Sequence, residues 1–506
     1  MIEFEVDGHQ VQVPDDGASL LDTLRDHLDK RSAKDGCAPQ GQCGCCTVLV
    51  DGQPRVACVT PTRRVKGRSI TTLDGFADDE RQRWADAFCA TGASQCGFCT
   101  PGIIVRLAGL EEKKPDASHE DVRKALAAHL CRCTGWQTII EAWDQRNAEH
   151  APDRDFAAAA QRAEIEGRNQ QKVSPDVALG DAGFADDRAP ADALVAVRDE
   201  QGEWFVGESL HEARTLAGKI QGRRTTLEQS YPVDLPDGEW AATLQTGWVD
   251  PAYLETDAAW ALPGEPAVSP LENGGAFGAK QASIVTAVAE ELANKHARPV
   301  RVLLSREDAI RLGAKRPPVA GGANADGTGT IRVVSTAGIE EAIAAVAPDL
   351  TVEQVATAGD LVTSADIRGA GWVEAVALLA LARGEADRVH APDGGWAEAT
   401  VTDEGIDVQV GAGAFLDDVV LRSYCIGAAH MGYSLVMGEA LTVDEHGIAQ
   451  DLTVRSFGVV RAADTPPINV ALVAEDGPAV NGSDAVFAAV AAATALHVQA
   501  HSWPHG

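Results

Sequence analysis

The feature that most constrains this chain is the clustering of its cysteines, because eight of the 11 lie in two short groups before residue 134. The first group is Cys37, Cys43, Cys46 and Cys58, and the second is Cys96, Cys99, Cys131 and Cys133. In a reducing compartment, such groups favour metal binding over disulfide formation. We therefore expect each group to converge on a metal centre in a cytoplasmic protein.

The residues around the first group predict a small ferredoxin-like β-grasp domain over residues 1–72. Residues 1–12 alternate apolar and polar side chains around the turn dipeptide Asp7-Gly8, which indicates a β-hairpin. Ser19 can cap a helix whose apolar face is Leu20, Leu21, Leu24 and Leu28. A Gly- and Cys-rich loop follows at 36–46, and then strands at 47–50 and 55–59 flank an Asp-Gly turn.

The spacing within the first group predicts an iron–sulfur site. Cys37, Cys43 and Cys46 read C-x₅-C-x₂-C, close to the plant-type C-x₄-C-x₂-C pattern, and Cys58 is the distant fourth ligand. Glycines let backbone amides turn inward and donate hydrogen bonds to the sulfurs. Structural zinc also accepts four thiolates, but the Gly-rich spacing and the β-grasp context favour iron. Cys45 is interpreted as a bystander, although its position beside Cys46 leaves the choice of ligand open.

The second group lies in a segment with helical periodicity, residues 73–148. Cys96 and Cys99 precede Pro101, a residue suited to a first helical turn. Ser118 begins another helix, which we expect to end at the C-x-C pair of Cys131 and Cys133. A pair at a helix start and a pair at a helix end can meet in a helical bundle. Two neighbouring four-cysteine sites suit electron transfer.

Residues 1–150 resemble the iron–sulfur subunit of the xanthine dehydrogenase (molybdenum hydroxylase) family, in the stretches 36–50, 95–102 and 130–135. The resemblance implies two [2Fe–2S] clusters, one in the β-grasp domain and one in a four-helix domain close to a molybdopterin cofactor. It also implies that Gln95 and the backbone at Cys133 approach the pterin. The first spacing has one extra residue and Trp136 replaces a more usual tyrosine, but neither difference removes a ligand.

The rest of the chain predicts a linker or connecting helix at 149–174 and a mixed α/β region at 175–506. That region resembles a shortened molybdopterin-binding subunit in five stretches, which are 180–187, 274–280, 302–308, 368–374 and 424–475. The resemblance implies cofactor-binding roles for Gly274, Gly275, Phe277, Gly278 and Arg368. A glycine-rich loop can equally be a tight turn between a strand and a helix, and both interpretations stay open. The predicted fold class is therefore α+β and multidomain.

The catalytic residues are not identified by the sequence. The family's hydroxylation chemistry uses a glutamate near the carboxy terminus, and the matching stretch 479–484 contains none. Asp484 is either a shorter substitute or, as we favour, a helix cap beside Ser483. No nucleotide-binding glycine fingerprint for FAD is found either.

The net charge of −32, from 43 basic and 75 acidic residues, argues against a nucleic-acid or membrane partner. The amino terminus shows no signal-peptide pattern, and the apolar stretch 485–498 is too short to span a bilayer and predicts a buried helix.

We therefore expect the electron-transfer subunit of a multi-subunit molybdenum hydroxylase. Its expected partners are a larger molybdopterin-binding subunit, where a small-molecule substrate reacts, and a separate FAD subunit. Two alternatives stay open, which are a self-contained small molybdenum hydroxylase and a non-catalytic iron–sulfur interaction module.

Overall fold

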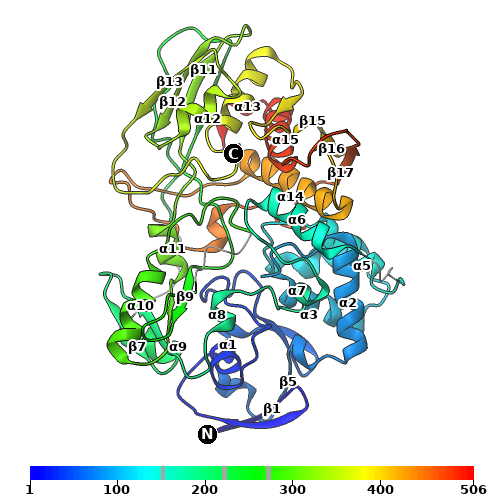
Figure 1. Cartoon of the computed structure of the whole chain (residues 1–506), viewed down its shortest axis with the longest axis vertical. Coiled ribbons are helices and arrows are strands. Elements are labelled where there is room, and N and C mark those ends of the chain that lie inside the picture. The colour runs from blue at the N-terminus through cyan, green and yellow to red at the C-terminus, as the bar shows by residue number, and fades with distance from the viewer. Residues whose placement is uncertain (150–153, 219–224, 269–274, 506) are drawn as a thin grey trace.

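The computed structural model describes residues 1–149, 154–218, 225–268 and 275–505. The amino-terminal cysteine-bearing part forms one end of an elongated molecule, and the carboxy-terminal lobe forms the other (Figure 1). A small α/β unit lies beside the amino-terminal part. The predicted α+β multidomain class is confirmed.

The amino-terminal sheet has the order β2-β1-β5-β3-β4. Its strands are β1 (Ile2–Val6), β2 (His9–Val13), β3 (Thr47–Val50), β4 (Gln53–Val56) and β5 (Ser69–Thr71). Val6 pairs with His9 across the Asp7-Gly8 turn, whose residues have φ of 49° and 77°. These positive values suit a two-residue hairpin turn, so the predicted hairpin is present.

The segments between these strands are helical turns that carry the core. Ser19 caps α1 (Leu20–Asp22), which continues as the π-helix η1 (Thr23–His27) instead of the regular helix we expected. β4 ends at Val56, so the predicted strand 55–59 is wrong at its second half. Residues 57–59 form the 3₁₀ turn η2 (Ala57–Val59), and Cys58 therefore lies on a turn. Two further 3₁₀ turns are η3 (Thr62–Val65) and η4 (Leu73–Gly75).

Four α-helices follow, which are α2 (Asp78–Thr91), α3 (Thr100–Lys113), α4 (His119–Ala125) and α5 (Gln137–Gln145). Ser118 and Asp121 form a reciprocal capping box at the start of α4, as the sequence indicated. The chain leaves α4 through η5 (Leu126–Ala128), so Cys131 and Cys133 lie in a loop before α5 and not at a helix end. The predicted helix is therefore too long by several residues.

The predicted linker is a packed part of the molecule. It contains α6 (Phe156–Gly167), which lies against the long helix α14 (Asp418–Met437). Arg162 and Glu166 of α6 form an ion pair of 2.7 Å, and both side chains have 0% exposure. Two short helices follow, α7 (Pro175–Ala178) and α8 (Ala185–Arg188).

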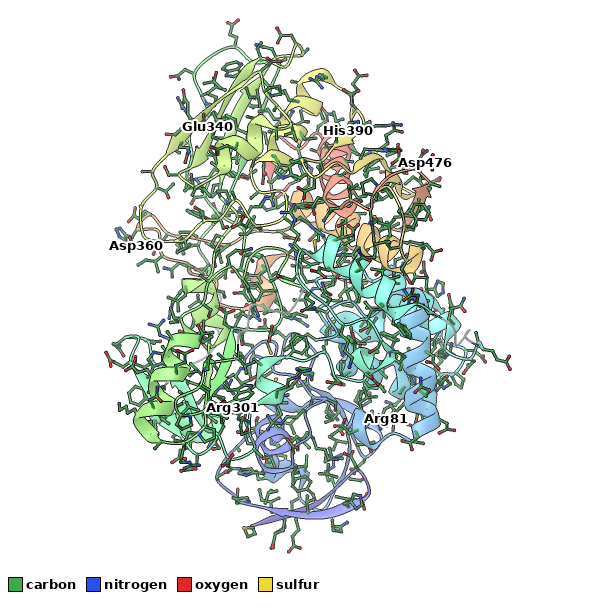
Figure 2. All side chains as sticks on the ribbon, in the orientation of Figure 1. Arg81, Arg301, Glu340, Asp360, His390 and Asp476 are labelled. Carbon is green, nitrogen blue, oxygen red and sulfur yellow. The ribbon has the colours of Figure 1, made fainter. Side chains whose placement is uncertain are left out.

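The small α/β unit contains a sheet with the order β7-β6-β10-β9. Its elements are β6 (Leu194–Arg198), β7 (Trp204–Gly207), α9 (Leu210–Ala217), β9 (Ala258–Ala261), α10 (Val285–His296) and β10 (Val300–Leu303), and α11 (Arg306–Leu312) follows. Arg301 of β10 forms ion pairs with Asp26 and Asp186 beside the amino-terminal domain (Figure 2). This contact ties the unit to the first cysteine-bearing domain.

The carboxy-terminal lobe contains two sheets and four helices. The first sheet has the order β13-β12-β11-β8-β18 and the second β14-β15-β16-β17. Its strands are β8 (Ala242–Thr246), β11 (Val319–Ala323), β12 (Gly329–Val334), β13 (Leu350–Val355), β14 (Val389–His390), β15 (Trp396–Thr402), β16 (Gly405–Gly411), β17 (Ile468–Val473) and β18 (Ser502–Trp503). Its helices are α12 (Ile339–Ala344), α13 (Trp372–Arg383), α14 and α15 (Ser483–Val498), with the turn η7 (Val454–Phe457).

Helix α15 is the core of this lobe. It packs against α14, α13 and β15, and its first thirteen residues, 483–495, are all buried. The sequence therefore predicted this buried helix correctly. Across the described ranges, no helix is both long and apolar enough to cross a membrane.

Candidate metal centres

The four cysteines of the first set lie together beneath the surface. Cys37, Cys43 and Cys46 are each 1% exposed and Cys58 is 5% exposed, and all four are free thiols. The Cys37 thiol is within hydrogen-bonding range of the thiols of Cys43 and Cys58, and the Cys58 thiol is within range of that of Cys46. The fold therefore brings the predicted ligands to one place.

Backbone amides point at these sulfurs. The Gln40 N–H donates to Cys37 Sγ at 3.0 Å, and the Cys58 N–H donates to Cys46 Sγ at 3.4 Å. The pKa of the Cys37 thiol lies well below its ordinary value, because the thiols of Cys43 and Cys58 and the backbone around Gln40 stabilise its thiolate. The same thiol contacts and burial raise the pKa values of Cys43 and Cys58. Cysteine binds iron as the thiolate, and Cys37 is the thiol of this set whose pKa these contacts lower.

Glycines allow the loop to pack this tightly. A Cβ at Gly36 would lie 3.2 Å from Cys43 Sγ, and one at Gly44, where φ is +74°, would lie 2.4 Å from a ring carbon of His129. Cys45 is fully buried, and its thiol donates weakly to the Cys43 carbonyl at 3.8 Å. Its role as a bystander stays a prediction.

The second set forms two close pairs. The Sγ atoms of Cys96 and Cys133 are 3.6 Å apart, and the thiols of Cys99 and Cys131 are within hydrogen-bonding range. The pKa of Cys131 is lowered to about 6, first by the Cys99 thiol and then by Thr134, whose hydroxyl lies 3.1 Å from Cys131 Sγ.

Paired thiols match the ligand set of a two-iron cluster, in which each iron takes two cysteines. The described residues include no group of three or more His, Cys, Asp or Glu side chains arranged around a single ion. In the second set, the thiols approach in pairs.

A short connection joins the two sets. The Leu130 N–H donates to the Cys43 carbonyl at 3.0 Å, and Leu130 immediately precedes Cys131. His129 is buried beside Gly44, and its Nε2 lies 3.2 Å from the Thr47 hydroxyl. Burial and the nearby Arg106 lower the pKa of His129 to about 3, so it stays neutral between the two sets.

The chain's own second half covers the second set. Gln95 Nε2 donates to the Cys133 carbonyl at 3.1 Å and to the Ser423 hydroxyl of α14 at 2.9 Å. A Cβ at Gly427 of α14 would lie 1.8 Å from the Cys133 carbonyl oxygen, and one at Gly275 would lie 3.0 Å from Cys96 Sγ. Gln95 and Cys133, which we expected to approach a pterin, therefore face this chain.

The glycine-rich loop at 275–278 also closes onto the chain itself, as a tight turn would. A Cβ at Gly278 would lie 1.8 Å from the Asp366 carbonyl oxygen, and the Phe277 ring stacks under the Arg368 guanidinium at 4.1 Å. Gly274 lies outside the described residues.

The Arg368 guanidinium is held entirely by groups of this chain. It donates to the Ser483 hydroxyl at 2.8 Å and to the Glu166 carbonyl at 2.9 Å, and it forms an ion pair with Asp484 at 2.8 Å. Asp484 also pairs with Arg168. Gly482 occupies the cap position of α15, so the helix-cap interpretation of Asp484 is wrong, and its carboxylate is a counter-ion to two arginines.

The space beside the second set does not fit a pterin. In the cavity lined by Cys96, Cys133, Glu255 and Lys280, the volume that the centre of a water molecule can occupy is about 10 Å³. The neighbouring cavity against Arg368 leaves about 30 Å³. The first is about the size of a single water site. Contact with a pterin therefore stays a prediction, and it requires this region to open. The residues concerned are Gln95, Cys133, Gly275, Phe277, Gly278 and Arg368.

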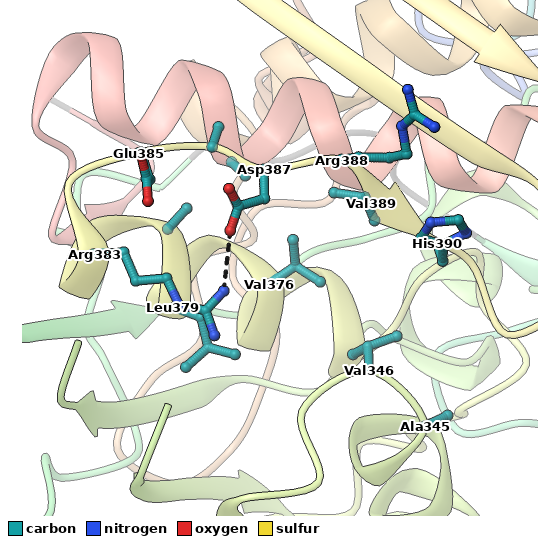
Figure 3. A pocket seen from close by; sticks show the side chains of 13 residues that line it. Ala345, Val346, Val376, Leu379, Arg383, Glu385, Asp387, Arg388, Val389 and His390 are labelled. Carbon is teal, nitrogen blue, oxygen red and sulfur yellow. Dashed lines mark hydrogen bonds and ion pairs between the residues drawn. The ribbon is translucent and has the colours of Figure 1, made fainter. Parts of the chain in front are cut away.

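A larger cavity, of about 250 Å³, lies away from the cysteines (Figure 3). It is lined by α13, the turn after α12 and the segment leading into β14, and Arg383 donates to Asp387 there at 3.3 Å. No cysteine is among its lining residues.

Two buried arginines near the cysteines were missed by sequence reasoning. Arg132 lies between Cys131 and Cys133 and donates to Glu439 at 2.9 Å. Arg306 donates to the Gly36 carbonyl at 2.6 Å and to the carbonyls of Tyr253 and Leu254. The position of Arg132 between two cysteines was a local signal, but nothing in the sequence around Arg306 points to Gly36.

Comparisons with known proteins agree with this geometry. Residues 72–144 match a family model described as a [2Fe-2S] binding domain. The chain is 40% identical over 142 residues to the nicotine 6-hydroxylase small subunit of Paenarthrobacter nicotinovorans, which covers 28% of this chain and 86% of that protein. It is also 40% identical over 121 residues to the nicotinate dehydrogenase small FeS subunit of Eubacterium barkeri, covering 24% of this chain and 76% of that protein.

The chain belongs to the xanthine dehydrogenase (molybdenum hydroxylase) family. Its similarity to these relatives lies in the iron–sulfur, electron-transfer part of this oxidoreductase family. The aldehyde oxidoreductase of Desulfovibrio gigas matches the structure with a TM-score of 0.71 at 15% identity, over 100% of this chain and 99% of that one. This likeness shows that the two proteins share their fold over the length of this chain.

Proposed function

We propose that the two cysteine sets hold two [2Fe–2S] clusters and that the chain is the electron-transfer subunit of a molybdenum hydroxylase. The first set is Cys37, Cys43, Cys46 and Cys58, and the second is Cys96, Cys99, Cys131 and Cys133. The single observation that carries this proposal is the convergence of eight free thiols into two sets, seven of them buried and Cys96 half-buried. We also propose the corresponding division into residues 1–72, 73–148, 149–174 and 175–506.

When bound, each cluster would accept and release one electron at a time. This chain's residues hold them, exclude water and donate hydrogen bonds to sulfur, which tunes the reduction potential. The Gln40 N–H, the Cys58 N–H and the Thr134 hydroxyl are placed for this role. The hydrogen bond between Leu130 and Cys43 supports passage of electrons from one set to the other.

A partner chain would supply the molybdopterin. This proposal is supported by the filled space beside Cys96 and Cys133 and by the absence of a glutamate in the stretch 479–484. Relatives such as the nicotine 6-hydroxylase small subunit are named as small subunits. We propose a larger pterin-binding partner at which the small-molecule substrate reacts, with FAD on a further subunit or another acceptor receiving the electrons.

Metal analysis and electron paramagnetic resonance of the isolated chain test the proposal. We expect about four iron atoms per chain and two distinct signals after reduction, because each set binds one two-iron cluster. Stoichiometric zinc or a single signal would contradict it. Co-purification of the native complex should yield a larger, molybdenum-containing chain, which a non-catalytic interaction module would lack.

A further inference from the structure

A basic segment surrounds one of the proposed cluster ligands in this very acidic chain. Residues 52–73 contain no Asp or Glu, although the whole chain has 75 acidic and only 43 basic residues. The same segment carries five basic residues, which are Arg55, Arg63, Arg64, Lys66 and Arg68. The local sign of charge is therefore opposite to that of the molecule.

Most of these charges are free. Arg55, Arg63, Arg64 and Lys66 are exposed, and none forms an ion pair with a carboxylate among the described residues. Arg68 is the exception, because it pairs with Asp51 at 2.6 Å. Unpaired surface charges keep their full field for a partner, whereas paired ones largely cancel.

The segment also brings a proposed ligand toward the surface. Cys58, on η2, is the most exposed cysteine of the first set, and its neighbour Val59 is 54% exposed. Arg55 and Arg63 are close to Cys58 along the chain, so their Cα atoms lie at most about 11 Å and about 18 Å, respectively, from the Cα of Cys58. Charges and an exposed apolar side chain thus lie close to one cluster site.

Elsewhere the chain itself packs over parts of both sets, and Cys96 of the second set is half-buried. Gln40 donates to the Leu452 carbonyl at 2.7 Å, and Gln42 accepts from the Arg455 N–H at 3.1 Å. The second set lies beneath α14 and the loop at Gly275. For the first set, the side of Cys58 and Val59 is therefore the candidate route for electrons to a separate protein.

We propose that Arg55, Val59, Arg63, Arg64 and Lys66, here called the basic patch, form a docking surface for an acidic one-electron carrier protein. The proposal rests on the proposed function and adds the exit surface and the charge of the acceptor. An apolar centre with a charged rim is the usual anatomy of a protein interface. The rest of this chain carries a net negative charge, so the basic patch both attracts and orients an acidic protein.

The electron balance is simple. The carrier is reduced by one electron as cysteine-bound iron is oxidised by one, and no bond forms or breaks. Arg55 also lies on the edge strand β4, where a charged side chain prevents strand pairing. The test therefore uses Arg63 and Arg64, which lie on η3 and outside the sheet.

The experiment measures binding of oxidised plant-type ferredoxin, an acidic carrier, to the full cluster-loaded chain at low ionic strength. In the variant R63E/R64E, we expect binding at least about tenfold weaker than in the unmodified chain, because two attractive charges become repulsive. The matched control K295E/R461E reverses two exposed basic residues, one on α10 and one after η7, that form no ion pair among the described residues, and it should stay within about twofold. Added salt should weaken binding only where the basic patch is intact.

Iron content and reduction of ferricyanide by the dithionite-reduced chain show whether each variant keeps its clusters. Loss of iron in the unmodified chain would count against the proposed function and not against the basic patch. Equal ferredoxin binding by R63E/R64E and the unmodified chain would overturn the docking proposal. So would tighter binding of anionic lipid vesicles or duplex DNA than of ferredoxin.

Discussion

Each proposed cluster ligand takes its chemistry from a few neighbouring atoms. In the first set, the backbone donors at Gln40 and Cys58 and the glycines at 36 and 44 shape the site. The spacing of the cysteines was sufficient to predict which four would converge. It could not reveal Arg306, whose contact with Gly36 joins residues 270 positions apart.

The variant Cys43→Ser should lose the β-grasp cluster and keep the helical one, because the two sets share no ligand. Iron should fall from about four to about two atoms per chain, and one of two paramagnetic signals should disappear. Cys45→Ser is the matched control and should retain both signals. Loss of both clusters from a Cys43→Ser chain that is still folded would show that the two sets are not independent.

A buried histidine should make the folded chain sensitive to acid. His430 of α14 lies against the Val460 carbonyl at 3.0 Å, and burial and the nearby Arg132 lower its pKa to about 4. The unfolded chain binds this proton near pH 6.5, so stability is complete above that pH and is lost as the pH falls toward 4. The loss is on the order of 1.4 kcal/mol per pH unit across this window.

Urea unfolding of His430→Gln tests this expectation, because the glutamine amide can still donate to Val460 but does not titrate. The difference in stability between neutral and acidic pH should shrink in this variant. The exposed His446→Gln should behave like the unmodified chain. The buried Glu255, whose pKa is raised to about 7 by desolvation, acts in the opposite direction. The comparison between variants, in which Glu255 is constant, therefore isolates the histidine.

At the scale of elements, α14 decides how the helical iron–sulfur site is enclosed. Its Gly427 lets the helix backbone reach the Cys133 carbonyl, and its Ser423 holds Gln95. Gly427→Ala would place a methyl group within 1.8 Å of that carbonyl oxygen, so helix and loop must separate. We expect a loss of about 1–3 kcal/mol, typical of overpacking, and an altered signal from the helical cluster only.

The matched control is Asp418→Ala, an exposed substitution in the first turn of the same helix, which should cost no more than about 1 kcal/mol. Chemical denaturation and paramagnetic resonance provide the two measurements. An unchanged helical signal in Gly427→Ala would show that α14 does not constrain the Cys131–Cys133 loop.

The sequence correctly predicted the elements that are determined by adjacent residues. The Asp7-Gly8 hairpin, the Ser118 capping box and the buried helix at 483–498 each follow from adjacent residues. The π-helical turn at 23–27 and the early end of β4 at Val56 have no comparable signal among adjacent residues. Helix α14 covers Cys133 although the two lie about three hundred positions apart in the sequence. No pattern among neighbouring residues predicts such a contact.

At the scale of the whole molecule, buried charges join the parts. Arg301 bridges Asp26 and Asp186, Arg25 pairs with Asp186 and Asp187, and Arg132 pairs with Glu439. Removing one partner of such a buried pair usually costs about 3–5 kcal/mol. The Arg132–Glu439 pair joins the helical domain to the carboxy-terminal lobe, and the other pairs join the amino-terminal domain to α8 and to the small α/β unit.

The purified chain, loaded with iron, sulfide and molybdenum cofactor, should not hydroxylate purines, N-heterocycles or aldehydes with an artificial acceptor. No glutamate is present at 479–484, and removal of a general base usually costs about 10²–10⁴ in rate. Turnover should appear when a larger partner chain is added. Robust turnover by the chain alone would establish a self-contained hydroxylase instead.

The late position of the covering residues has a consequence for biosynthesis. Both cysteine sets leave the ribosome long before α14 and the Leu452–Arg455 segment, which afterwards lie over Cys133 and over Gln40 and Gln42. We therefore expect iron and sulfide to enter the sites more readily before these late segments have packed. A chain refolded without metal should acquire clusters slowly, as absorbance during reconstitution would reveal, whereas a loaded chain should resist chelators for as long as it stays folded.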